Sequence, residues 1–256
     1  MEQNQETYNK ESVIAEYEQF NFLFKAEEKI FIKLHSPLKK SAVLDIGIGA
    51  GRTTKYLAKL CRQYVGVDYS QNFIDHCKKK LSSFSNSVFE FADVRSMPQF
   101  ADNSFDFILF SFNGIDYINI EGRNLALKEC KRLLKDGGIF CFSFHNFNTI
   151  PKLYSLYMSK NPLKWKASWH RYKMVNKLNP KVSSFANKDY VILRDGGDDF
   201  ELDTMYMKPQ YQLGMLKDYG FEPICFYDAE KGIKITPLQL SESKAQWIYA
   251  LTKLKK

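Results

Sequence analysis

The chain has 256 residues, of which 45% are hydrophobic and 15% aromatic, and it carries a formal net charge of +8. This length and apolar content suit one α/β domain with additions, and they exclude a disordered or fibrous chain. No apolar stretch reaches the roughly 18 residues of a membrane span, and no basic segment precedes an apolar one at the N-terminus. The sequence therefore predicts a soluble cytoplasmic protein.

The positive charge is concentrated in one segment. Residues 151–188 contain eight Lys, one Arg and no Asp or Glu, so this segment carries +9 and the rest of the chain sums to −1. Trp and Tyr side chains are interleaved with the lysines. Three interpretations remain open: a solvated lid, a site for a phosphate-bearing substrate, and an RNA-binding surface that contacts phosphates and stacks on bases.

The residues that commonly bind metals form no ligand pattern. The five cysteines are scattered without a C-x-x-C pair, and they are interpreted as small core residues of a protein in a reducing compartment. The acidic cluster between Asp195 and Asp203 matches no ordered ligand loop and is interpreted as a charged hairpin turn. We therefore expect no metal site.

Two helices are predicted before the first strand, over residues 11–20 and 21–35, with Pro37 ending the second. Residues 1–40 would then form a helical cap. Such a cap either covers a ligand pocket, with Tyr8 or Tyr17 closing it, or packs on the edge of the sheet as an amphipathic pair.

A strand, a glycine-rich turn and a helix follow. The apolar run of residues 42–46 leads into Gly47, Gly49 and Gly51, and a helical pattern begins at once. Glycine permits positive φ and close approach of a ligand to the backbone, and a helix N-terminus offers free N–H groups. A dinucleotide fingerprint would need a glycine where Arg52 stands, so a pyrophosphate site is disfavoured.

Strands over residues 64–68, 88–92 and 105–110 then alternate with helices over about 52–61, 72–81 and 123–134, and residues 135–138 are predicted to form a turn after the last of these helices. This alternation indicates a parallel sheet with right-handed crossovers. After the fifth predicted strand, residues 139–144, the pattern is interrupted by the basic segment and by a predicted β-hairpin made of residues 190–193 and 200–206. The remaining predicted elements are a helix over 210–219 and strands over 221–227 and 247–254.

The motif Asp45-x-Gly47-x-Gly49-x-Gly51 resembles the first motif of the class I S-adenosylmethionine-dependent methyltransferases. The likeness extends over residues 41–145, because Asp68 and Asp93 each follow a further predicted strand, Asp68 standing 23 positions after Asp45. It implies a Rossmann-like α/β fold with a mostly parallel seven-stranded sheet and helices on both faces. The domain would span residues 41–256, with an elaboration at 151–207.

The resemblance also implies positions for the cofactor, S-adenosyl-L-methionine, and its product S-adenosyl-L-homocysteine. The glycine turn would lie against it, Asp68 would bind the ribose, and Asp93 would face the adenine amino group. The residues implied to bind the cofactor are Asp45, Gly47, Gly49, Gly51, Arg52, Asp68, Tyr69, Asp93, Val94, Phe110 and Ser111.

The acceptor side is expected at the ends of the fourth and fifth strands. His145 is the candidate general base and Asp116 its catalytic companion, because an imidazole titrates near neutrality. Asn113, Tyr117 and Asn146 are expected to bind the substrate. Ser111-Phe112-Asn113-Gly114 lacks the Asn/Asp-Pro-Pro-aromatic motif of the branches of the family that methylate base amines.

These observations favour methyl transfer to an oxygen or nitrogen of a small molecule, such as a sugar nucleotide or glycan, as in the bacterial members that the sequence resembles. Two alternatives remain: a tRNA or rRNA methyltransferase that uses residues 151–188, and a non-catalytic S-adenosylmethionine-binding scaffold. The sequence does not indicate an oligomeric state.

Overall fold

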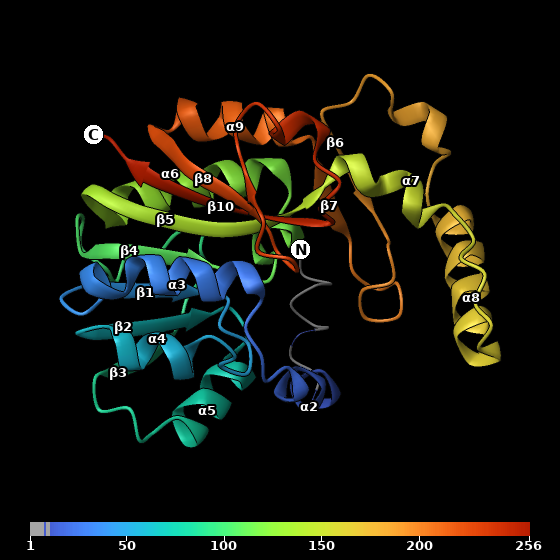
Figure 1. The fold of residues 1–256 in the computed structure, drawn as a ribbon. Coiled ribbons are helices and arrows are strands. Elements are labelled where there is room, and N and C mark those ends of the chain that lie inside the picture. The colour runs from blue at the N-terminus through green and yellow to red at the C-terminus, as the bar shows by residue number, and fades with distance from the viewer. Residues whose placement is uncertain (1–7, 9–10) are drawn as a thin grey trace.

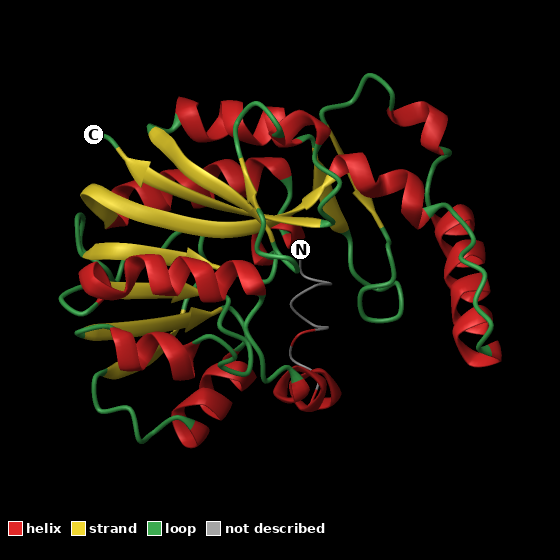
Figure 2. Ribbon diagram, viewed as in Figure 1, coloured by secondary structure: helices red, strands yellow, loops and turns green. Residues whose placement is uncertain are grey.

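One mixed β-sheet, covered by helices on both faces, runs through the computed structural model, which describes Tyr8 and residues 11–256 (Figures 1 and 2). Its strands are β1 Ala42–Ile46, β2 Gln63–Asp68, β3 Ser87–Phe91, β4 Phe105–Phe110, β5 Leu134–Asn146, β6 Tyr190–Leu193, β7 Thr204–Met207, β8 Phe221–Asp228, β9 Lys234–Ile235 and β10 Trp247–Leu254.

The helices alternate with the strands as the sequence pattern indicates. The α-helices are α2 Glu11–Gln19, α3 Lys25–Leu38, α4 Thr54–Leu60, α5 Gln71–Lys80, α6 Ile120–Leu133, α7 Ile150–Leu153, α8 Pro162–Leu178 and α9 Pro209–Asp218. Short 3₁₀ turns are η1 Gly114–Tyr117, η2 Phe147–Thr149, η3 Val182–Phe185 and η4 Leu240–Glu242. None of the helices among the described residues has the length and apolarity needed to cross a bilayer.

The strand order is β3-β2-β1-β4-β5-β10-β8-β9, with β6 and β7 attached beside β5. Strands β1 to β5 pair in parallel, whereas β10 lies antiparallel between β5 and β8. The Rossmann-like fold is therefore confirmed, but the expected count of seven strands is wrong: the described residues form ten. Two of the additional strands, β6 and β7, are the predicted hairpin, which joins the sheet through the pairing of β7 with β5. The third is the two-residue β9, which is too short to leave a pattern in the sequence.

Different helices cover the two faces of the sheet. Helices α3, α4 and α5 pack on one face, against side chains such as Val43 and Leu109. Helices α6 and α9 pack on the other face, around Leu44, Ile108 and Phe142. All five residues of β1 are buried and four of them are apolar, as expected of a strand covered on both faces.

Two predicted boundaries are corrected by the structure. Pro37 lies inside α3, which continues to Leu38; a proline this close to the C-terminal end removes only one hydrogen bond, and Leu38 is buried. Residues 135–138, predicted as a turn after the helix, form an irregular part of β5, since pairing with β4 passes from Phe105–Leu134 to Phe107–Ile139.

The insertion after β5 has a small apolar core of its own, which includes Ile150, Val175 and Phe185. Strand β7 begins at Thr204 and not at Phe200 as predicted, because residues 198–200 have positive φ and belong to the connecting loop. In this hairpin β7 pairs antiparallel with β6, and it also continues the sheet by pairing in parallel with the end of β5.

Candidate active site

A cavity of about 380 Å³ opens at the carboxyl ends of β1, β2, β3 and β4. Ligands of open parallel sheets bind at this edge. Eight of the residues predicted to bind the cofactor line the cavity: Gly47, Gly49, Asp68, Tyr69, Asp93, Val94, Phe110 and Ser111.

The glycine turn presents bare backbone to the cavity. Gly47 and Gly49 have φ of +66° and +51°, which disfavours any side chain. A Cβ atom at Gly47 would lie 3.1 Å from the Phe110 ring, and one at Gly49 would lie 3.3 Å from the Tyr17 ring. The turn therefore leaves room for a ligand to contact the main chain.

Asp68 is a buried carboxylate at the end of β2. Its Oδ2 accepts a hydrogen bond from the Gly49 N–H at 2.9 Å, and its Oδ1 accepts one from the Ser70 N–H at 2.9 Å. Burial raises its pKa to about 6, and these backbone donors limit the rise. Each oxygen keeps a further lone pair, so a ligand with two hydroxyl groups fits this group.

Asp93 lies in the part of the cavity wall formed after β3. Although burial raises its pKa, hydrogen bonds from the Arg95 side chain and backbone hold it below its ordinary value. Asp93 is therefore an ionised acceptor at neutral pH, suited to an amino donor such as that of adenine.

Asp45 and Gly51, which were also predicted to bind the cofactor, lie outside the lining. Asp45 Oδ2 accepts hydrogen bonds from Thr53 Oγ1 at 2.6 Å and Tyr64 Oη at 2.8 Å, so this carboxylate holds the turn together. Its Oδ1 is buried without a partner, and burial raises its pKa to about 6. Gly51 faces Leu81, whose Cδ1 would lie 2.5 Å from an added Cβ.

Arg52, likewise absent from the lining, is held by an ion pair with α3. Its guanidinium donates to both carboxylate oxygens of Glu27 at 2.6 Å and lies over the rings of Phe24 and Phe112. Tyr249 Oη also donates to Glu27, at 2.7 Å. Arg52 lines a smaller neighbouring cavity of about 30 Å³, where its charge is already balanced. Glu27 cannot be recognised as a buried partner from the sequence, because an acid in an amphipathic helix resembles a surface residue.

A cluster of tyrosines covers the cavity. The ring of Tyr8 makes edge contacts with Tyr17, Tyr69 and Tyr117 at centroid distances of 5.9–6.0 Å. All four rings line the cavity, and Tyr8 also packs with Leu202 from the loop between β6 and β7. The helix preceding the sheet and the inserted hairpin therefore meet above the carboxyl edge.

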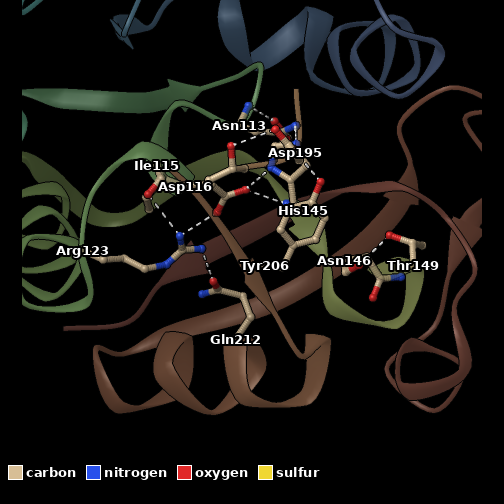
Figure 3. A network of polar contacts seen from close by, with 12 residues as sticks. Asn113, Ile115, Asp116, Arg123, His145, Asn146, Thr149, Asp195, Tyr206 and Gln212 are labelled. Atoms are coloured by element: carbon tan, nitrogen blue, oxygen red, sulfur yellow. Dashed lines mark hydrogen bonds and ion pairs between the residues drawn. The ribbon is translucent and has the colours of Figure 1, made fainter. Parts of the chain in front are cut away.

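His145 and Asp116 form a buried pair beside the cavity (Figure 3). Asp116 Oδ2 lies 2.9 Å from His145 Nδ1 and accepts the His145 backbone N–H at 2.6 Å. Asp116 Oδ1 pairs with Arg123, which is buried and also donates to Gln212. Arg123 cannot be recognised as part of this network from the sequence, because a basic residue in an amphipathic helix resembles a surface residue.

Neither member of this pair lines the cavity. His145 is 4% exposed, and its ring packs against Tyr206 and Trp247 at centroid distances of 4.9 and 5.5 Å. Asn113 Nδ2 lies 3.4 Å from His145 Nε2. These contacts link the segment after β4 to the ends of β5 and β7.

The three residues predicted to bind the substrate have different positions. Tyr117 lines the cavity, whereas Asn113 is fully buried behind it. The Asn146 side chain donates to the carbonyls of Ser243 and Ala245, both at 2.9 Å, and accepts from the Asn148 N–H. Asn146 therefore ties the end of β5 to the segment before β10 and has no free amide hydrogen for a substrate.

Two carboxylates of the hairpin have partners within the hairpin. Asp195 accepts from Tyr206 Oη at 2.6 Å, and Asp203 pairs with Arg194 at 3.1 Å. Within the part of the chain that the structure describes, no group of three or more His, Cys, Asp or Glu residues could hold a metal ion.

Together, the strand order, the glycine turn and the carboxylates at the strand ends define a nucleotide-binding domain of the Rossmann-like class. A family model described as a methyltransferase domain matches residues 43–138. Residues 43–138 are therefore similar to the methyltransferase domain family, and the fold of the chain is shared with solved S-adenosylmethionine-dependent methyltransferases.

Known proteins agree with this assignment at moderate similarity. The chain is 29% identical over 161 residues to the demethylmenaquinone methyltransferase of Staphylococcus aureus, an alignment that covers 57% of this chain and 64% of that protein. A methyltransferase from Clostridium acetobutylicum is 17% identical, with a TM-score of 0.63 and coverage of 91% and 92% of the two chains. The 1,6-didemethyltoxoflavin-N1-methyltransferase of Burkholderia thailandensis, solved with S-adenosylhomocysteine, is 12% identical, with a TM-score of 0.56 and coverage of 90% and 79%. The two structures show the shared fold.

Proposed function

We propose that this chain transfers the methyl group of S-adenosylmethionine to an oxygen or nitrogen of a small-molecule acceptor. The observation that carries the proposal is the cavity in which the Gly47 and Gly49 backbone faces the buried Asp68 carboxylate. The cofactor supplies an electrophilic methyl group on a sulfonium. The protein then has to hold the nucleophile, methyl and sulfur in line, which supplies much of the rate.

The residues present suit each part of the cofactor. Asp68 accepts from ribose hydroxyls and Asp93 from the adenine amino group, while Tyr69 and Val94 provide apolar surface for the base. We assign Asp45 an indirect role, because it lies outside the lining and holds the turn through Thr53 and Tyr64. We assign Arg52 an indirect role, because Glu27 occupies its guanidinium.

The lining of the cavity favours an uncharged acceptor. Its acceptor side includes Phe110, Phe112, Tyr117 and Ile118, and the cation of the described lining, Arg95, is paired with Asp93. The similar proteins of Staphylococcus aureus and Burkholderia thailandensis are named for demethylmenaquinone and 1,6-didemethyltoxoflavin, which are also small molecules. A sugar nucleotide or glycan remains a second candidate, for which the lining offers hydrogen-bonding groups but little positive charge.

An RNA acceptor is the competing proposal, and the basic segment is the observation that favours it. Residues 151–188 contribute no side chain to the described cavity lining. A protein that neutralises several phosphates loses affinity steeply between about 50 and 200 mM salt. Binding of a small acceptor through apolar contacts should change little over that range.

The test is transfer of a radiolabelled methyl group to a panel of phenolic and quinol compounds, sugar nucleotides and RNA, at both salt concentrations. We expect transfer to an uncharged small molecule that persists at high salt. Transfer only to RNA, and only at low salt, would replace the small-molecule proposal. Binding of S-adenosylhomocysteine without transfer to any acceptor would favour a non-catalytic scaffold.

A further inference from the structure

Helix α8 carries an exposed aromatic stripe. Trp165, Trp169 and Tyr172 recur at spacings of four and three residues and therefore lie on one side of the helix. They are 43%, 45% and 37% exposed. Isolated exposed apolar residues are ordinary, but three large rings on one helix face mark a contact surface.

A basic stripe runs beside the aromatic one. Lys166, Lys173 and Lys177 recur at spacings of seven and four, and all three are exposed. Lys173 Nζ lies 5.3 Å from the centroid of the Trp169 ring. No acidic residue occurs between positions 151 and 188, so this charge is not balanced within the segment itself.

Further exposed apolar side chains lie at the start of α8 and in the turn before it. Tyr157, Met158 and Leu163 are 65%, 78% and 78% exposed. The Tyr157 N–H donates to Ser168 Oγ at 2.9 Å, which ties this turn against α8. The exposed apolar turn and the aromatic stripe therefore belong to one unit.

The attachment of α8 does not use this surface. The buried residues of α8 are Ser168 and Val175, on the side that faces the small core of the insertion. Figure 1 shows α8 projecting beyond the carboxyl edge of the sheet, the edge at which the cavity opens. Its outer surface is open to a large partner on that side of the molecule.

We propose that residues 156–178 bind the surface of a bilayer that contains anionic phospholipids. Trp and Tyr favour the headgroup level, aliphatic side chains enter the acyl boundary, and lysines attract anionic headgroups. The exposed Leu156, Met158 and Leu163 favour a bilayer over RNA, because aliphatic side chains do not stack on bases. The helix lies on the membrane and does not cross it. This inference does not depend on the proposed methyl transfer.

Vesicle binding by the full chain tests the proposal. We expect binding to vesicles of phosphatidylglycerol and phosphatidylcholine, none to phosphatidylcholine alone, and weakening by salt. The chain has three tryptophans, so Trp emission should shift to the blue on binding; the double variant Trp165→Phe/Trp169→Phe, which retains only Trp247, should bind without that shift. The triple variant Lys166→Gln/Lys173→Gln/Lys177→Gln should bind roughly 100-fold more weakly.

A matched variant separates this surface from overall charge. Lys39→Gln/Lys78→Gln/Lys79→Gln removes the same charge from exposed positions elsewhere and should bind as the unmodified chain does. Equal weakening by both triple variants, or no vesicle binding at all, would overturn the proposal. Tight binding of a single-stranded RNA oligonucleotide in the absence of vesicle binding would overturn it in favour of RNA. Circular dichroism confirms that each variant is folded.

Discussion

Asp68 is the residue that most directly links the fold to cofactor binding. Its carboxylate closes the glycine turn through the Gly49 N–H and keeps lone pairs for a ligand. Asp68→Asn should weaken S-adenosylhomocysteine binding about 10- to 100-fold, since hydrogen bonds to charged groups contribute about 1.5–3 kcal/mol. Calorimetric titration measures the change. Asp136→Asn, an exposed acid outside the cavity lining, is the control and should leave affinity unchanged.

The raised pKa of Asp68 gives this binding a pH dependence. Burial raises the pKa to about 6, and ligand hydroxyls that donate to the carboxylate would lower it again. The complex then holds fewer protons than the free protein, so affinity should fall as pH drops below about 6, by at most tenfold per pH unit. The Asp68→Asn variant should lose this part of the slope. An affinity that is flat from pH 5 to 8 in the unmodified protein would contradict the assignment.

Arg123 should matter to stability more than any exposed basic residue. It is completely buried and balances Asp116. Arg123→Met leaves a buried carboxylate without its cation and should lower the free energy of unfolding by about 3–5 kcal/mol. Lys25→Met removes the exposed pair with Glu28 and should cost at most about 1 kcal/mol. Denaturant titration of both variants makes the comparison, and similar losses would refute the buried-pair account.

Substitution of His145 tests whether this residue is a catalytic base or a positioning residue. Because it lies outside the cavity lining, His145→Gln should lower the unfolding temperature and leave kcat within a few-fold of the unmodified value. A general base typically contributes 10²–10⁴-fold. A kcat loss of that size, together with loss of the pH profile and an unchanged unfolding temperature, would establish His145 as the base.

At the residue scale, the sequence predicted the positions of those site residues that directly follow a strand. Asp68, Asp93 and the glycines follow apolar strands directly, so their place at one sheet edge could be inferred. The pairing of Arg52 with Glu27, and of Arg123 with Asp116 and Gln212, depends on how α3, α6 and α9 pack on the sheet. Neither helix periodicity nor spacing encodes those contacts.

At the element scale, the loop between β6 and β7 is the feature that sequence alone placed least well. Leu202 packs with Tyr8 and Val13, so the loop and the N-terminal helix support each other over the cavity. Leu202→Ala should therefore speed S-adenosylhomocysteine dissociation while changing the unfolding temperature little, because the loop lies outside the two main cores. Stopped-flow displacement measures the rate. Leu238→Ala, at an exposed position, is the control.

The predicted elements were correct where a strand or helix has its own periodic pattern. They were wrong where pairing with a distant strand determines the bounds of the element. Strand β7 adds to the end of β5, with His145 opposite Tyr206, a pairing between residues about 60 positions apart. A two-residue strand such as β9 has no pattern to detect. In contrast, the antiparallel β10 was predicted with its observed bounds, because it begins with five apolar residues in a row.

At the scale of the whole molecule, charge and cavity are separate. The cavity is lined mainly by aromatic and aliphatic side chains, whereas the excess positive charge lies in residues 151–188. This separation is why the net charge alone does not identify the acceptor. It also means that binding of the cofactor and binding of a charged partner can be measured independently.

The most direct test of the central claim is thermal unfolding of the purified protein with S-adenosylhomocysteine, S-adenosylmethionine or NAD, each near 1 mM. A ligand at 100 times its dissociation constant adds about 2.7 kcal/mol to the free energy of unfolding. We predict an upward shift of the unfolding temperature with the two adenosyl-sulfur ligands and none with NAD. A folded protein that shows no shift with either of those two ligands would contradict the account of the cavity.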